Sequence, residues 1–284
     1  MNFQGFVDAI KEKNLEVYGA QVFHKDKIVG SWQEEPMLRH PIYSATKSIT
    51  SLAVGMARDD GKFDIEAPIY EYLRSKVPIY ANQKQLENLK KLSVKRLLTM
   101  SVQGYPFRPE GDNWLEFSLL YPLEKVEEPV FDYSNIPAYL VGVAVAKALG
   151  VHLYDYLEER LFNPLGIVEP SFQNCPSGYF YGASGMFLTV PELAKIGQLC
   201  LQKGMFEGQR LVSETYIDEA TSIQQMNREG GYGYFFWKYK EGYRISGKWG
   251  QRSFVFPEKN MVITYLSNNG SGEVTEAMEK FILQ

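Results

Sequence analysis

The sequence has few of the residues that would indicate a disulfide framework or a metal centre. Among its 284 residues there are two cysteines, Cys175 and Cys200, and three histidines. Two cysteines so far apart do not make a disulfide framework and suit a reducing compartment. His24 and His40 have no companion at metal-ligand spacing, so we interpret them as ordinary surface or boundary residues. No metal-binding or phosphate-binding pattern occurs, and we predict that no cofactor or metal is needed.

Charge of one sign is not concentrated along the chain, and no apolar run is long enough to span a membrane. The formal net charge is -4 and the basic residues are scattered, so nothing favours nucleic acid or an anionic membrane as a partner. Residues 1–13 form an amphipathic pattern without the features of a signal peptide. We therefore expect no membrane insertion and a cytoplasmic protein if Met1 is the true start, or an extracytoplasmic one if a leader was removed.

Apolar and aromatic residues are abundant, at 45% and 14% of the chain, which is enough for one large domain or two interleaved ones. Strand patterns occur near both ends of the chain, and their residue ranges are 17–24, 27–32, 233–239, 243–246, 252–256 and 261–267. The intervening part is mainly helical. This order predicts an α+β fold, in which both termini build one antiparallel sheet flanked by helices, with an inserted mainly helical region. We expect a sheet domain of residues 1–58 and 182–284, and an inserted domain of residues 59–181.

Helical patterns are predicted in six places, with residue ranges 3–13, 93–100, 136–149, 153–161, 191–201 and 273–282. Residues 105–129 are polar, aromatic and punctuated by proline, so we predict a long loop there. Such a loop is either the lid or wall of a pocket or a surface connector.

The first candidate for chemistry is Ser44, which is followed by Lys47 at the start of a helical run of small and apolar residues. Residues three apart lie on the same face of a helix. A lysine in a dry pocket loses basicity and can then take the proton of a serine hydroxyl. The spacing alone occurs by chance about once in a chain of this length. The alternative is a helix-capping Ser44 and a solvated Lys47.

The second candidate is Tyr133 with Asn135, just before the predicted helix 136–149. A phenol near a protonated lysine ionises more easily and can exchange a proton as base and acid. An amide such as that of Asn135 can donate to a substrate carbonyl and also hold the lysine. The alternative is a packed tyrosine with a wet hydroxyl and an asparagine that caps the helix.

The third candidate is the glycine-bearing stretch from Arg244 to Gln251. Glycines at a strand edge allow close approach of a ligand and expose an N–H group for an oxyanion. The alternative is a hairpin or bulge whose backbone angles require glycine.

Ser-x-x-Lys, Tyr-x-Asn and a late glycine-bearing strand, in this order, resemble the serine β-lactamase and penicillin-binding-protein superfamily, and in particular its class C branch. The branch includes esterases, D-peptidases and amide hydrolases. The resemblance covers nearly the whole chain. It extends to residues 93–100, to the Pro164-Leu165-Gly166 segment and to the hairpin around Pro257. It implies a β-lactamase/transpeptidase-like fold.

The resemblance also implies roles for individual residues. Ser44 would be the nucleophile, Lys47 its proton acceptor, and Tyr133 the group that activates the deacylating water and protonates the leaving group. The family's third motif is usually Lys-Thr-Gly or a histidine variant, and this sequence departs from it. Either Lys248-Trp249-Gly250 stands for that triplet, with Gln251 as the N–H donor, or Ile245-Ser246-Gly247 does, with Lys248 as the donor.

We prefer the second register, because it leaves Gly250-Gln251 where many family members have Gly-Gln. Ile245 then replaces the cation that meets a substrate carboxylate, unless Lys248 or Arg244 compensates. The candidate substrate-binding and oxyanion residues are Ser44, Asn135, Ser246, Gly247, Lys248 and Gln251.

Three functions follow from the resemblance. The first is a serine hydrolase that forms an acyl-enzyme on Ser44 and acts on small esters or amides. The second is a true class C-type β-lactamase, D,D-carboxypeptidase or penicillin-binding protein. The third is a non-catalytic sensor module with the same fold. All three imply a small-molecule ester, amide or β-lactam as the partner, and no pattern in the chain specifies an oligomeric state.

Overall fold

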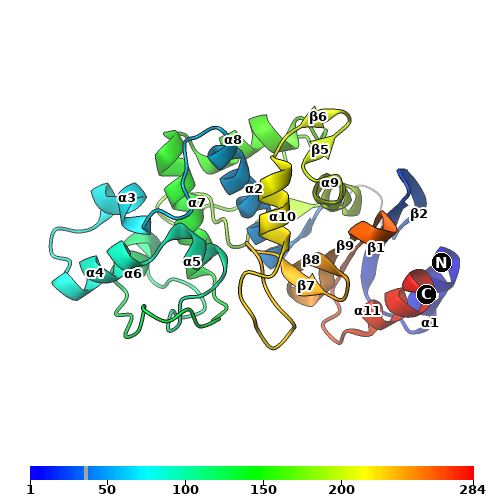
Figure 1. The fold of residues 1–284 in the computed structure, drawn as a ribbon. Coiled ribbons are helices and arrows are strands. Elements are labelled where there is room, and N and C mark those ends of the chain that lie inside the picture. The colour runs from blue at the N-terminus through cyan, green and yellow to red at the C-terminus, as the bar shows by residue number, and fades with distance from the viewer. Residues whose placement is uncertain (35–37) are drawn as a thin grey trace.

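The computed structural model describes residues 1–34 and 38–284. Its centre is a six-stranded antiparallel sheet with the order β2-β1-β10-β9-β8-β7 (Figure 1). The strands of this sheet are β1 (Val17–His24), β2 (Lys27–Gln33), β7 (Trp237–Tyr239), β8 (Gly242–Gly247), β9 (Gln251–Phe256) and β10 (Met261–Ser267). Two short antiparallel pairs are β3 (His40–Pro41) with β4 (Phe187–Leu188), and β5 (Met205–Phe206) with β6 (Gln209–Arg210).

The N-terminal hairpin joins the C-terminal strands directly. Its turn residues Lys25 and Asp26 both have positive φ, at 49° and 64°, as a tight turn between twisted strands requires. Strand β1 pairs with β10, so the two ends of the chain share one sheet. The termini lie side by side in Figure 1, where the Asn2 N–H donates to the Phe281 carbonyl at 2.6 Å. The predicted α+β architecture with a sheet from both termini is confirmed.

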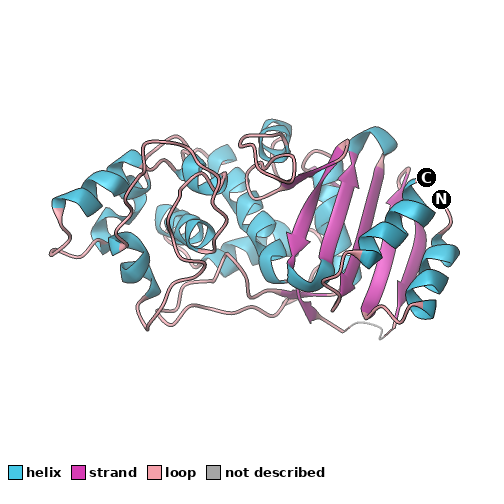
Figure 2. Ribbon diagram, turned by 90° about the horizontal axis from the view of Figure 1, so that it is seen from below, coloured by secondary structure: helices cyan, strands magenta, loops and turns pink. Residues whose placement is uncertain are grey.

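Helices cover both faces of the sheet (Figure 2). Helices α1 (Phe3–Glu12) and α11 (Glu273–Met278) pack together on one face, where their apolar side chains bury against Phe254 and Tyr265. Helix α9 (Val190–Leu201) packs against β1, β9 and β10. The helix approaches β9 closely because Gly197 has no side chain. A Cβ at this position would lie 2.4 Å from the Ser253 hydroxyl of β9. These two layers bury the sheet and leave its β7–β8 edge toward the helical region.

The remaining helices form the part of the molecule away from the termini (Figure 1). They are α2 (Thr46–Asp59), α3 (Ile69–Leu73), α4 (Gln83–Lys91), α5 (Val94–Leu98), α6 (Trp114–Leu120), α7 (Ile136–Leu149), α8 (Leu153–Leu157) and α10 (Glu214–Thr221). Helix α7 is almost wholly buried and contacts α2, α3 and α5. Proline in its first turn and left-handed Gly150 after its last residue set its limits.

Buried apolar side chains from both predicted domains belong to one continuous core. Ile42, Val54, Leu140 and Val262 are all members of it. The division of the chain into two domains stays a prediction.

Two local predictions were wrong. The long loop of residues 105–129 contains α6, which begins after Asn113 because that side chain accepts from the Glu116 N–H at 3.2 Å. The predicted strand 233–239 is reduced to β7. Residues Tyr232 to Phe236 instead bury their aromatic side chains in the core, so packing rather than sheet pairing determines their backbone.

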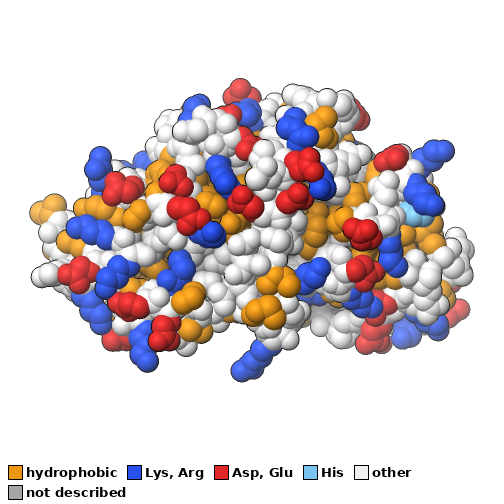
Figure 3. Space-filling model, viewed as in Figure 1, with side chains coloured by type: hydrophobic (Ala, Val, Ile, Leu, Met, Phe, Trp, Pro, Cys, Tyr) orange, Lys and Arg blue, Asp and Glu red, His pale blue; other side chains and the backbone are white. Residues whose placement is uncertain are grey.

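Charge is mixed on the face of the molecule shown in Figure 3, and the described residues contain no disulfide. Acidic and basic side chains alternate with apolar ones on the face shown in Figure 3. Cys175 and Cys200 are both buried and free. In residues 1–34 and 38–284, no single helix is long and apolar enough to cross a membrane. Two consecutive helical segments, 136–149 and 153–162, reach that length and apolar content only when taken together, and they are bent by 80° relative to each other.

Candidate active site

Ser44 lies in a one-turn 3₁₀ helix, Tyr43–Ala45, which leads into α2. Tyr43 has a φ of 47°, an uncommon conformation for a residue with a side chain and one found in functional turns. The residue at the capping position of α2 is Ala45, whose side chain makes no hydrogen bond. Ser44 therefore does not cap this helix. Ser44 is partly exposed, so a ligand can reach the hydroxyl.

Lys47 is in the first turn of α2 and points into the protein, with 1% of its surface exposed. Its ammonium nitrogen lies 3.1 Å from the Ser44 hydroxyl oxygen, 2.5 Å from the Asn135 side-chain oxygen and 2.8 Å from the Ala183 carbonyl. It forms no ion pair with any carboxylate among the described residues. The alternative of a solvated Lys47 is therefore wrong.

Burial without a carboxylate partner lowers the pKa of Lys47 from its ordinary value to about 7. A charged ammonium loses its hydration in this environment, and three neutral acceptors replace only part of it. The nitrogen also lies 5.0 Å from the centre of the Tyr133 ring. At neutral pH a large fraction of Lys47 is consequently a free amine, in reach of Ser44.

Asn135 holds Lys47 in place. Its side-chain oxygen accepts from Lys47, and its amide nitrogen donates to the Tyr181 hydroxyl at 2.8 Å. The side chain makes no capping bond to α7, although the residue precedes that helix. Its backbone N–H is bonded to the Phe107 carbonyl at 2.7 Å. Asn135 is thus a positioning group for the lysine rather than a helix cap.

Tyr133 lies against the same pair, with its ring partly exposed and packed on Trp237 at 5.2 Å between ring centres. Burial raises the pKa of Tyr133 to about 12, although a hydrogen bond with Ser44 opposes this rise. This phenol does not ionise easily in the resting site, because the effect of burial on its pKa outweighs the opposing effects of the Ser44 hydrogen bond and the Arg252 charge. Tyr133 is a neutral phenol that bonds to the Ser44 hydroxyl.

The third motif lies at the end of β8, past the residues that pair with β7, and beside the turn that carries Ser44. A Cβ on Gly247 would lie 2.1 Å from the Ile42 carbonyl oxygen, two residues before Ser44. A Cβ on Gly250 would instead meet the Ser267 hydroxyl at 2.2 Å. Only the first glycine therefore faces the serine turn, and this geometry favours the register Ile245-Ser246-Gly247.

The side chains of Gln251 and Lys248 contact groups other than Ser44. The Gln251 amide is buried and donates to the Lys248 and Ser267 carbonyls, at 3.2 and 2.5 Å. Its side chain therefore holds the β8–β9 turn, and its predicted role as a backbone N–H donor to the substrate stays a prediction. The Lys248 ammonium lies 4.5 Å from the Trp249 ring centre. Ser246 is partly exposed and pairs with Arg252 across the sheet, which places the two side chains on one face.

The sequence reasoning missed three groups near the site. The Ala183 carbonyl bonds to Lys47 and the Tyr181 hydroxyl bonds to Asn135, and both residues lie beside Gly182 in the segment that follows Phe180. Arg252 donates to the Gly247 and Gln251 carbonyls. Its charge also opposes the rise in the pKa of Tyr133. No motif marks any of these groups, because their role depends on the folding of distant segments.

A cavity of about 560 Å³ lies beside Asn135. It is lined by aromatic, amide and hydroxyl side chains and by one cation, and these residues are Phe107, Arg108, Trp114, Asn135, Gln173, Asn174, Tyr181 and Ser184. Trp114 comes from α6, so the segment predicted as a loop forms a wall of this cavity. Across residues 1–34 and 38–284 no group of three or more His, Cys, Asp and Glu side chains is arranged to hold a metal.

The sequence matches the model of the family described as Beta-lactamase over residues 6–284. No protein with a curated description matches it.

Several solved structures share the fold. A protein of Bacillus anthracis described as a candidate 6-aminohexanoate-dimer hydrolase has a TM-score of 0.77 and 17% identity, over 98% of this chain and 80% of that one. A penicillin-binding protein from Bacillus halodurans has a TM-score of 0.77 and 18% identity, over 97% and 99% of the two chains. A penicillin-binding-protein homologue from Caulobacter crescentus has a TM-score of 0.76 and 14% identity, over 97% and 94%.

Proposed function

The chain belongs to the beta-lactamase family, and we propose that it is a serine hydrolase that forms an acyl-enzyme on Ser44 and acts on small esters or amides. One observation carries this proposal. Lys47 is a buried amine with a pKa of about 7, 3.1 Å from the Ser44 hydroxyl, and it has no carboxylate partner among the described residues. A serine hydroxyl is a weak nucleophile until such a base takes its proton.

The acylation step uses Lys47 as base and Tyr133 as acid. As the Ser44 oxygen attacks the substrate carbonyl carbon, its proton passes to the Lys47 nitrogen. The tetrahedral intermediate then expels the alcohol or amine, which takes the phenol proton of Tyr133. A neutral phenol is suited to this role, and the raised pKa of Tyr133 keeps the proton available. The step ends with acylated Ser44, a charged Lys47 and a Tyr133 phenolate.

Deacylation returns each proton to its origin. The phenolate of Tyr133 takes a proton from water as the water oxygen attacks the acyl carbon. The Ser44 oxygen leaves and takes its proton back from charged Lys47. The ring of Tyr133 lies 5.0 Å from the Lys47 nitrogen, so each charge favours the other in this intermediate state. The products are a carboxylic acid and the resting enzyme.

Two backbone N–H groups would hold the oxyanion, those of Ser44 and Lys248. The close contact between Gly247 and the Ile42 carbonyl supports this assignment, because it holds the end of β8 against the serine turn. N–H groups fixed before the reaction stabilise developing charge without a cost of reorganisation. In this assignment Lys248 acts through its backbone, and its side chain is free to vary.

The proposed substrate lacks a carboxylate at the third motif. Ile245 is fully buried in the core and presents no charge to the site. The cavity beside Asn135 would take the acyl group, since its aromatic and amide side chains suit an uncharged body with a few hydrogen-bonding groups.

A specific observation favours a second candidate, a β-lactam or peptide hydrolase. Arg252 is near enough to influence Tyr133, and it forms no ion pair with a carboxylate among the described residues. It could meet a substrate carboxylate in place of the usual cation of the third motif. Arg244, by contrast, is paired with Glu229.

The test is intact-protein mass spectrometry after mixing with an activated acyl ester or a penicillin, with Ser44→Ala as control. We expect a transient acyl adduct from the ester on the native protein alone. A lasting penicillin adduct would instead indicate penicillin-binding chemistry, and consumption of penicillin would indicate a lactamase. If neither reagent marks Ser44, the protein is a non-catalytic module. Loss of activity with a chelator would contradict the prediction that no metal is needed.

A further inference from the structure

The cavity beside Asn135 carries one positive charge in its lining and, among the residues that the structure describes, no negative one. The cation is Arg108, and the acids Glu110 and Asp112 of the same loop do not belong to the lining. Arg108 is exposed and forms no ion pair within residues 1–34 and 38–284. An unpaired cation in the wall of a cavity favours a negative group of a ligand.

Tyr181 contacts several other lining residues, which shows that they surround one space. Its ring centre lies 4.9 Å from that of Trp114, and its hydroxyl accepts from the Asn135 amide at 2.8 Å. Its backbone N–H donates to the Gln173 carbonyl at 3.0 Å. Burial raises the pKa of Tyr181 to about 12, and the Asn135 hydrogen bond and the charge of Arg108 oppose this rise. The Arg108 guanidinium is therefore near the same phenol.

The loop that carries Arg108 is fixed on both sides. The Phe107 carbonyl accepts from the Asn135 N–H at 2.7 Å, and the Trp114 indole N–H donates to the Gly111 carbonyl at 3.0 Å. Arg108 lies between these two anchors, so its backbone is held beside the cavity before a ligand arrives. Such preorganisation lowers the entropic cost of binding.

The cavity also offers neutral hydrogen-bond donors. The side chains of Gln173, Asn174 and Ser184 line it and form no hydrogen bond within the described ranges 1–34 and 38–284. Each can donate to a carboxylate oxygen. Two hydrogen bonds connect this lining to the nucleophile, because the Lys47 nitrogen is bonded to both Ser44 and Asn135.

We propose that the acyl group of the substrate ends in a carboxylate that Arg108 binds, so that the substrate is a half-ester or half-amide of a dicarboxylic acid. This inference rests on the proposed function, in which the uncharged body of the acyl group lies in this cavity. Ser44 attacks the carbonyl at one end, and the guanidinium meets the carboxylate at the other, where it can bind both oxygens. Arg108 thus determines specificity and takes no part in the proton transfers.

The first experiment measures binding without reaction, on the Ser44→Ala protein. The ligands are adipamate, which carries one carboxylate, and adipamide, its neutral analogue of the same length. Binding is followed by the NMR signal of the Trp114 indole N–H. We expect a saturable shift with adipamate, with a dissociation constant on the order of 1 mM. Adipamide should bind roughly 3- to 10-fold more weakly, and about 1 M sodium chloride should remove most of this difference.

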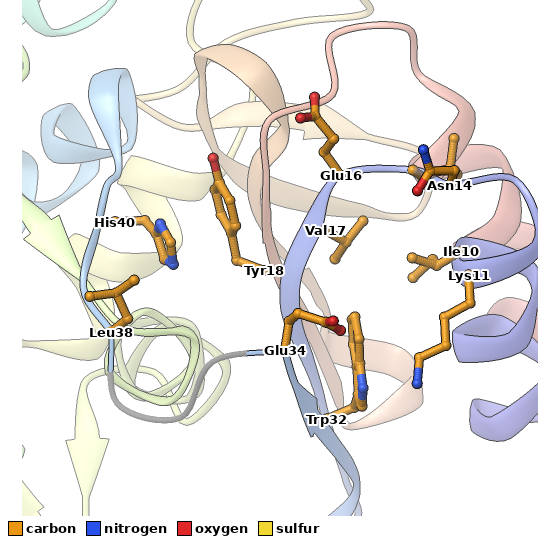
Figure 4. Close-up of a pocket in the computed structure, with 11 residues that line it drawn as sticks. Ile10, Lys11, Asn14, Glu16, Val17, Tyr18, Trp32, Glu34, Leu38 and His40 are labelled. Carbon is orange, nitrogen blue, oxygen red and sulfur yellow. The ribbon is translucent and has the colours of Figure 1, made fainter.

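A second indole shows where the ligand binds. Trp32 lines a larger cavity, of about 720 Å³, beside the β1–β2 hairpin (Figure 4). That cavity shares no lining residue with the proposed site, and the carboxylates of Glu16 and Glu34 outnumber the ammonium of Lys11 in its lining. The Trp32 signal should therefore not move with adipamate. Trp114→Phe and Trp32→Phe assign the two signals.

The second experiment tests the charge of Arg108 during hydrolysis. The substrates are the 4-nitrophenyl monoester of adipic acid and the 4-nitrophenyl ester of adipamic acid, which differ only in the charge of the remote end. The ratio of their kcat/KM values should favour the charged ester by roughly 3- to 10-fold in the native protein and fall to about one in Arg108→Gln. Arg108→Lys should keep part of the preference. The matched control is Arg74→Gln, which removes an exposed arginine outside the lining and should leave the ratio unchanged.

The outcomes separate this inference from the proposed function. Equal binding of the two ligands, a shift of Trp32 instead of Trp114, or an unchanged kcat/KM ratio in Arg108→Gln would each overturn the role of Arg108, and hydrolysis at Ser44 would still support the proposed function. Charge-selective binding to Ser44→Ala, without hydrolysis of either ester by the native protein, would contradict the proposed function and support the carboxylate site.

Discussion

Replacement of Lys47 by methionine tests the central claim about the candidate site, namely that the folded protein holds this lysine largely as a neutral amine. Methionine has a similar length and is apolar, so it fills the same space without a titratable group. The unfolded chain binds a proton on Lys47 up to its ordinary pKa of 10.5, whereas the folded chain releases it at about 7. Between these values the unfolded state binds one more proton, so the free energy of unfolding of the native protein must rise with pH.

The size of this effect follows from the pKa difference of about 3.5, at ~1.4 kcal/mol for each pH unit. The native protein should therefore gain about 5 kcal/mol over Lys47→Met from pH 7 to 10.5, as an order of magnitude. At any single pH a second effect is present. Methionine leaves the Asn135 side-chain oxygen and the Ala183 carbonyl without a donor, at about 1–3 kcal/mol each. This offset does not change with pH, so the slope is the diagnostic quantity.

The assay is urea unfolding, followed by far-ultraviolet circular dichroism, at unit steps from about pH 7 to about pH 10. The native protein and Lys47→Met are compared with Lys125→Met, in which an exposed lysine that forms no ion pair within residues 1–34 and 38–284 is replaced. We expect Lys125→Met to follow the native protein, and Lys47→Met to fall behind it steadily as pH rises. Parallel curves for the native protein and Lys47→Met would refute a depressed lysine and, with it, the proposed base.

The remaining predictions concern catalysis. Hydrolysis of an activated ester should rise about tenfold per pH unit below about 7 and level off above it, because only neutral Lys47 accepts a proton; a flat profile would contradict this. Asn135→Asp places a carboxylate at the oxygen 2.5 Å from Lys47, so the same profile should move up by about 1–3 pH units. Tyr133→Phe should slow the acylation of Ser44 by an alkyl ester by about 10²- to 10⁴-fold and acylation by a nitrophenyl ester much less, because only the alkoxide needs a proton on leaving. Acylation is followed as the rate of adduct formation, which is separate from the role of Tyr133 in deacylation, and equal losses would argue against an acid role. Gly247→Ala brings a Cβ within 2.1 Å of the Ile42 carbonyl oxygen, so β8 must shift. We expect a loss of about 1–3 kcal/mol in stability together with a fall in kcat, and a normal kcat would remove Gly247 from the proposed oxyanion arrangement.

Local signals predicted the elements whose limits are set by a few neighbouring residues. Helix α7 begins and ends where the sequence predicted, because proline in the first turn and Gly150 after the last residue act within one turn. The β1–β2 hairpin and strand β10 were also predicted correctly, since their apolar patterns and turn residues are local. The order of the motifs was sufficient to predict the family and its fold.

Errors arose where packing outweighs local preference. The aromatic segment before β7 has the composition of a strand, but Phe235 has a φ of 64° and its carbonyl accepts from the Ser48 hydroxyl at 2.7 Å. Helix α6 was missed because its seven residues are flanked by the prolines and glycines of a loop, and its helical signal is short. In both segments, contacts with distant parts of the chain decide the backbone.

The sequence by itself determined which residues could do chemistry. Ser44 and Lys47 are three residues apart, and a single helical turn places them on the same face. The protonation states, in contrast, were decided by the tertiary structure. Asn135 and the Ala183 carbonyl meet Lys47 from 88 and 136 residues away, and they enclose it without a carboxylate. Burial then lowers the pKa of Lys47 and raises that of Tyr133. Because a pKa depends on hydration and on every nearby charge, only the folded arrangement assigns base and acid.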